Sequence, residues 1–248
     1  MSEESFKFPT ETIDLPSKGL IYPEDNPLSS GKVEMKYMTA KEEDILSNQS
    51  YIQNGTVLDK LLKALIVSKV NYNDLIVGDK NAIMIAARIL GYGKDYKFEY
   101  KGEEVEVDLS TLENKEFDES SIIQGINEFN FTLPTSGTEI TYKLLCHKDE
   151  MAIEAELKGL KKINKNADPS MSTRMKQMIL SVNGDSERKT VREFVDTYFL
   201  ASDARAFRKH VAAQQPDVNL LTQVELSDGG EDVEIPITVN FFWPDANI

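Results

Sequence analysis

The segment that most restricts the fold is residues 80–90, which are apolar on nearly every side of a helix. A helix of this kind is stable in water only when other elements surround it. Asp79 can cap its first turn, and Gly91 and Gly93 are residues that commonly end a helix. The sequence therefore predicts a helix at the centre of the core.

Other helices are predicted where apolar residues recur at helical spacing or where a capping residue precedes such a run. A Thr-x-x-Glu capping box begins two of them, at Thr39 and at Thr190. Asp203 opens the last one, and Pro216 prevents its continuation. Together with the helix at 80–90, the predicted helices cover residues 40–48, 57–69, 148–163, 169–182, 191–200 and 203–214.

Alternating apolar residues predict antiparallel strands between these helices. The clearest pair lies at about residues 95–109, around a Lys101-Gly102 turn. The other predicted pairs join residues 129–133 with 140–144 and residues 218–224 with 233–241. The expected fold class is α+β, with a helical core and several antiparallel β-hairpins.

The order of these elements divides the chain into three regions. Residues 1–38 form an extended amino-terminal arm, punctuated by Pro, Gly and Ser, and a first strand. Residues 39–126 form a helical region with the hairpin, and residues 127–248 hold a strand pair, helices and a carboxy-terminal hairpin. At 248 residues and 40% hydrophobic composition, all three can also form one compact domain.

Two of the predicted hairpins share an acidic motif that follows a helix and a Gly or Pro stop. Residues 102–107 read GEEVEV and residues 230–235 read GEDVEI. One interpretation is an internal duplication of a helix-plus-hairpin unit. The other is that two solvent-facing acidic turns have converged on similar residues.

The charge of the chain restricts its partners. It carries 28 Lys and Arg against 42 Asp and Glu, a net charge of −14. Nucleic acids and anionic membranes are bound by clustered cations, so we expect neither as a partner, and a basic protein is the natural complement. No apolar stretch reaches the roughly 18 residues that span a bilayer, and residues 1–9 lack the apolar core of a secretory signal. We expect a cytoplasmic protein.

Side chains that commonly carry catalysis or bind metals are few. Cys146 and His147 are adjacent, and neighbours in a strand or helix face different directions, so they cannot act together as nucleophile and base. The chain has one other histidine, His210. With a single cysteine it cannot form an intrachain disulfide. Phosphate-binding, dinucleotide-binding and EF-hand motifs are absent from the sequence. We therefore expect no enzymatic activity, no metal and no cofactor.

Two basic clusters stand out in this acidic chain. Residues 174–178 read RMKQM and residues 205–210 read RAFRKH. Phe207 between cations is compatible with nucleic-acid binding. The acidity of the whole favours a solvated helix face or a contact with a protein partner.

Five longer strings, taken together and in order, resemble the T4-type baseplate proteins of tailed bacteriophages, which are tied to the central hub of the tail baseplate and its assembly. The resemblance covers about residues 13–110 and 140–245. It rests on the number and order of the strings, because none is a catalytic signature. The strings are residues 15–46, 55–66, 75–96, 203–220 and 233–245.

The resemblance implies a non-enzymatic, chaperone-like assembly factor that binds phage baseplate hub proteins in the infected host cytoplasm. Alternatives are a structural subunit retained in the virion baseplate, a degenerate zinc-ribbon binding module, and a hydrolase that uses acidic residues. Members of this family often carry a Cys-x-x-Cys-Gly turn in such hairpins. Here Gly102 and Gly230 are present without cysteines, so the zinc-ribbon-like turns are degenerate and predict no metal. The oligomeric state stays open.

An assembly factor needs surfaces that bind proteins, and the amino-terminal arm is one candidate. Leu15, Leu20, Ile21 and Tyr22 stand between prolines and can lie in a partner's groove. The alternative is that they pack on their own domain.

The aromatic carboxy-terminal strand is the second candidate surface. Phe241 and Trp243 would share one face of this strand, and Phe242 would take the other. We expect one face to be core and the other to anchor a partner, with Phe242 and Trp243 as the candidate contacts.

Overall fold

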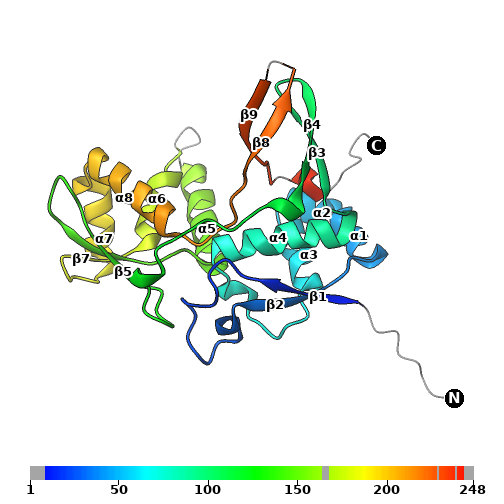
Figure 1. Ribbon diagram of the computed structural model, residues 1–248. Helices are drawn as coiled ribbons and strands as arrows, with labels where there is room; N and C mark the ends of the chain where they lie inside the picture. Colours follow the sequence, from blue (N-terminus) through cyan, green and yellow to red (C-terminus); the bar gives the residue numbers. More distant parts are fainter. Residues whose placement is uncertain (1–8, 164–167, 228, 238, 243–248) are drawn as a thin grey trace.

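The computed structural model describes residues 9–163, 168–227, 229–237 and 239–242, which form an α+β fold (Figure 1). The expected fold class is therefore confirmed. The helices are α1 (Ala40–Leu46), α2 (Gln49–Gln53), α3 (Val57–Leu65), α4 (Val77–Tyr92), α5 (His147–Ile163), α6 (Ser170–Met178), α7 (Arg188–Glu193) and α8 (Ala201–Gln214). The strands are β1 (Thr10–Asp14), β2 (Lys32–Lys36), β3 (Asp95–Tyr100), β4 (Glu103–Asp108), β5 (Phe129–Thr132), β6 (Glu139–Tyr142), β7 (Ile179–Val182), β8 (Leu221–Leu226) and β9 (Gly229–Glu234).

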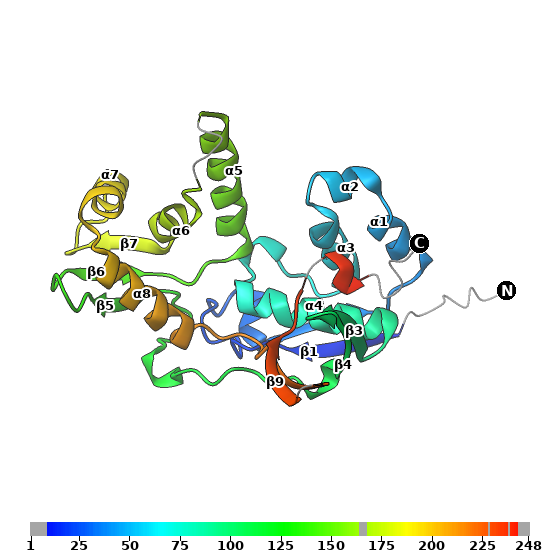
Figure 2. The ribbon, with the colours of Figure 1, turned by 90° about the horizontal axis from the view of Figure 1, so that it is seen from above.

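The elements form two lobes whose buried residues make one continuous core (Figure 2). We call the described residues within 9–126 and 216–242 the first lobe, and the described residues within 127–215 the second lobe. After α8 the chain returns to the first lobe, where β8 packs beside β4 (Figure 1). The expected region 127–248 is therefore split between the lobes, because the carboxy-terminal hairpin finds its apolar partner on the first hairpin.

The predicted central helix is present as α4, which lies in the middle of the first lobe (Figure 1). Ile83 and Ala87 on it are completely buried. The helix starts at Val77, so Asp79 lies inside its first turn and is not the cap. Gly93 ends the helix with φ of 84°, a backbone conformation that glycine adopts without strain.

The amino-terminal arm is more regular than predicted. Residues 10–14 form β1, which pairs antiparallel with β2. The connecting loop folds back on itself at Gly19, whose φ is 78° and whose missing side chain leaves room for the Ser29 carbonyl. Leu15, Ile21 and Leu28 are buried by this loop. An extended arm was therefore the wrong expectation for residues 15–31, because turn residues between two short strands close a compact loop there.

The two acidic hairpins pack against each other (Figure 1). In the first, Lys101 and Gly102 have φ of 52° and 83°, the positive pair that a tight hairpin turn requires. Tyr100 Oη donates to Glu231 across the contact at 3.3 Å, and the Ser227 amide donates to Glu103 at 3.0 Å. The structure does not show the expected zinc-ribbon-like turns. The described residues of these hairpins are held by strand pairing and by the hydrogen bonds between the hairpins.

The helices that precede the two hairpins do not repeat in space. α4 lies under the paired hairpins in the first lobe, whereas α8 belongs to the second lobe (Figure 1). The spatial repeat therefore comprises the hairpin alone, and an internal duplication of the whole unit stays a prediction.

The second lobe is built on a three-stranded sheet, β5–β6–β7, covered by α8. Residues 179–182 were expected to continue a helix, but they form β7 and pair with β6. The helix ends at Met178, and Ile179 becomes completely buried in the sheet. The expected helix 191–200 is also shifted: it begins at Arg188, where Thr190 hydrogen-bonds Asp185, and ends in a π-helical turn, Phe194–Tyr198.

Candidate functional site

Three of the four predicted contact residues of the amino-terminal arm lie in the protein's own core. Leu15, Ile21 and Tyr22 are 1%, 2% and 4% exposed, and Leu20 is half-buried. The apolar surfaces of Leu15, Ile21 and Tyr22 are therefore already covered within the chain. The alternative that the arm packs on its own domain is therefore the correct one.

Asp79 holds this arm in place. Its carboxylate accepts the Ser17 amide at 2.9 Å, the Ser17 hydroxyl at 2.7 Å and the Tyr22 hydroxyl at 2.6 Å. Tyr22 Oη in turn accepts the Ile76 amide at 3.1 Å. Burial raises the pKa of Asp79, and the hydrogen bonds from Tyr22 and Ser17 oppose that shift. This group ties residues far apart in the chain and acts as a structural support.

Of the two predicted carboxy-terminal contact residues, Phe242 and Trp243, the structure describes only Phe242. Phe242 ends a short 3₁₀ helix, Val239–Phe242, and is completely buried, with its ring edge-on to that of Phe241. The expected strand 233–241 instead stops at Glu234. Phe242 is therefore a core residue, because the helical turn directs both aromatic rings inward. Trp243 lies outside the described residues.

Cys146 and His147 point to different neighbours, as their adjacency predicts. Cys146 Sγ lies 3.2 Å from Asp149 Oδ2, and burial raises the pKa of this thiol. His147 is buried at the start of α5, edge-on to the Tyr72 ring at 4.6 Å. Neither residue is placed to activate the other.

A polar cluster that no sequence pattern predicted surrounds His147. Asp59 accepts Lys80 Nζ at 2.8 Å and Tyr72 Oη at 2.9 Å. His147 lies 3.6 Å from the Asp59 carboxylate and 3.3 Å from Lys80 Nζ. Burial lowers the pKa of His147, and Asp59 opposes that change. The polar groups of this cluster hydrogen-bond or pair with one another. The cluster therefore holds α3, α4 and α5 together where the lobes meet.

The lobes are joined by a short β-like contact beside this cluster. Ile76 and Cys146 form an antiparallel bridge. The Val77 amide donates to the Leu145 carbonyl at 3.1 Å, and the His147 amide donates to the Leu75 carbonyl at 2.8 Å. These bonds fix the start of α4 against the start of α5.

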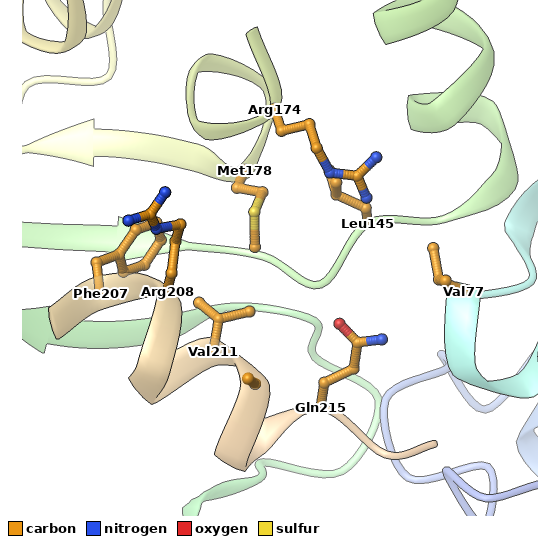
Figure 3. Close-up of a pocket in the computed structure, with 9 residues that line it drawn as sticks. Val77, Leu145, Arg174, Met178, Phe207, Arg208, Val211 and Gln215 are labelled. Atoms are coloured by element: carbon orange, nitrogen blue, oxygen red, sulfur yellow. The ribbon is translucent and has the colours of Figure 1, made fainter. Parts of the chain in front are cut away.

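A pocket of about 210 Å³ opens beside this junction, between α6 and α8 (Figure 3). Met178, Val211 and Gln215 point into it, and Val77 and Leu145 close the side next to the first lobe (Figure 3). The remaining lining residues are Arg174, Phe207, Arg208 and Ala212.

The two basic clusters of the sequence meet at this pocket. The first supplies Arg174 and Met178, and the second supplies Phe207 and Arg208. In Figure 3, Met178 lies between the two guanidinium groups. The two basic clusters could be found in the sequence and could have indicated this site. That they meet depends on how α6 and α8 pack, which no local pattern encodes.

Only one of these guanidinium groups is neutralised by the described residues. Arg174 forms a two-point ion pair with Glu150, at 3.0 and 2.6 Å. Within the described ranges Arg208 has no carboxylate partner, and its guanidinium touches the Met171 sulfur. The pocket therefore combines apolar walls with a cation that can still bind an anion.

Comparison with known protein families, curated proteins and solved structures found no match to this chain. The likeness to baseplate proteins therefore rests on the sequence strings alone. In the described ranges, no helix has the length and apolar character needed to cross a membrane. The same residues contain no group of three or more His, Cys, Asp or Glu side chains that could hold a metal ion.

Proposed function

We propose that this chain is a protein-binding assembly factor for the hub of a phage tail baseplate, acting in the infected host cytoplasm without enzymatic activity of its own. The pocket between α6 and α8 is the observation that carries this proposal. It offers apolar walls to a partner's side chain and a cation to anchor it, the combination found at the centre of protein interfaces. The resemblance to baseplate proteins supplies the identity of the partners.

Two neighbouring alanines on α8 allow a matched test. Ala212 lines the pocket, whereas Ala213 is exposed beside it and does not. In a pull-down with co-expressed baseplate hub proteins, Ala212→Trp should fill the pocket and abolish capture. Ala213→Trp adds the same side chain outside and should capture as the parent does. Equal capture by both variants would remove the pocket from the proposal.

The second candidate function is a structural subunit of the virion baseplate, which the same family resemblance implies. Mass spectrometry of purified virions separates the two. A transient factor should be absent or far below one copy for each hub protein. Stoichiometric amounts would favour the structural subunit.

A further inference from the structure

The pocket between α6 and α8 has the volume of a site for one side chain. Its volume of about 210 Å³ lies below the roughly 300–1,000 Å³ typical of pockets that hold a cofactor or drug-sized ligand. Met178, Phe207 and Val211 provide apolar contacts along its walls. A single large apolar side chain is therefore the best-matched occupant.

Polar groups at the pocket can hold the backbone and charge of the segment that carries this side chain. The Gln215 amide points into the pocket and makes no side-chain hydrogen bond within the described ranges (Figure 3). It can pair with a peptide group. Arg208 can bind a carboxylate in a two-point geometry, the arrangement that guanidinium groups favour.

The charge of the chain is unevenly distributed, and this distribution decides which sign of charge the partner segment should carry. Residues 127–215 carry 14 Lys and Arg against 12 Asp and Glu, whereas the rest of the chain carries 14 against 30. Screening at physiological salt limits charge effects to about 8 Å. An acidic segment at Arg208 therefore meets mainly the slightly basic second lobe. The basic partner expected from net charge suits the first lobe instead.

We propose that the pocket binds an acidic peptide segment of a partner protein, with one large apolar side chain between α6 and α8 and a neighbouring Asp or Glu on Arg208. This inference rests on the proposed protein-binding function and specifies the chemistry of the partner. Arg174 does not compete for the carboxylate, because Glu150 already occupies its guanidinium at two points.

The first test selects the ligand without assuming its source. The full chain is panned against a library of random dodecapeptides. We expect enrichment of sequences with Leu, Ile, Met or Phe close to Asp or Glu. Failure to enrich any acidic, apolar sequence would overturn the proposal.

The second test measures one enriched peptide, labelled with fluorescein, by anisotropy. Arg208→Glu should weaken binding about tenfold to a hundredfold, because it replaces a charged hydrogen bond with repulsion. The matched control is Arg205→Glu, which makes the same charge change on α8 outside the pocket lining. Equal losses in both variants would show a general charge effect and overturn the site.

Two further arms separate this inference from the functional proposal. A labelled single-stranded oligonucleotide that binds tightly and depends on Arg208 would replace the acidic peptide with nucleic acid and overturn the inference. If the enriched peptide binds the pocket but hub proteins are captured equally by the Ala212→Trp variant, the inference stands and the proposed hub function loses its site. Circular dichroism of each variant confirms that it is folded.

Discussion

At the scale of single residues, the chain stabilises itself with polar groups that it buries. Asp79 is completely buried and accepts three hydrogen bonds from the amino-terminal arm, and no cation pairs with it within the described ranges. Such a carboxylate is poorly placed to bind a ligand, because it is buried and already accepts three hydrogen bonds within the chain. Its role is to hold residues 15–22 against α4.

Replacing Asp79 with alanine should therefore loosen the arm. Asp79→Ala leaves the Ser17 amide and the hydroxyls of Ser17 and Tyr22 buried without an acceptor, which should cost about 2–4 kcal/mol of unfolding free energy. Urea denaturation measures this loss. Glu99→Ala at an exposed position should change the stability by less than about 0.5 kcal/mol. Equal midpoints for the two variants would contradict the supporting role.

A second residue-scale prediction concerns pH. His210 is stacked on Phe131 at 4.3 Å and lies 2.9 Å from Tyr142 Oη, and burial lowers its pKa. A pKa lowered by folding gives stability that is present above the unfolded value of about 6.5 and is lost as the pH falls through the folded pKa. His210→Gln should flatten the acid side of a Tm profile. An unchanged slope below about pH 6.5 would refute this.

At the scale of elements, helix ends and close approaches decide how the pieces dock. The capping box at Thr39 and Glu42 is formed as predicted, with Glu42 Oε2 accepting the Thr39 amide at 3.0 Å. Gly78 has a less obvious role. A Cβ there would overlap the Pro216 carbonyl, so glycine lets α4 pack directly on the chain returning from α8.

Two helical glycines with opposite surroundings give a matched prediction. Gly78→Ala should destabilise the protein by about 2 kcal/mol or more, because backbone must move to admit the methyl group. Gly159→Ala in exposed α5 meets nothing within 4 Å and should stabilise by about 0.5–1 kcal/mol, through helix propensity. Thermal unfolding of both variants measures the difference. The same sign for both would contradict the packing described.

At the scale of the whole molecule, one core runs through both lobes. Phe207 is completely buried in the second lobe, where its ring meets that of Tyr142 edge-on at 5.2 Å. The bridge of Ile76 to Cys146 links this lobe to α4. Stability in the two lobes should therefore be coupled.

Removing a second-lobe core side chain should weaken the first lobe as well. Phe207→Ala should cost about 3–5 kcal/mol, and hydrogen exchange should show lost protection in β3–β4 as well as in β6. The control Tyr198→Ala removes a ring that is 61% exposed and should leave both regions unchanged. Unaltered exchange in β3–β4 would mean that the lobes unfold separately.

Local sequence patterns were enough to predict some of the helices and strands. Residues 80–90 had to be a central helix because they are apolar all round, and Lys101-Gly102 between alternating runs had to turn a hairpin. Where signals competed, tertiary structure decided: residues 179–182 follow a helix without a break in composition, yet burial beside β6 makes them a strand.

The packed chain is needed to show which surfaces are free and which side chains meet. The amino-terminal arm and Phe242 are apolar enough for either a core or an interface, and only the packed chain shows that they are core. Asp79 meets Ser17 across 62 residues, and Arg174 and Arg208 reach one pocket from separate helices. Such meetings depend on long-range packing, which periodicity and capping patterns do not record.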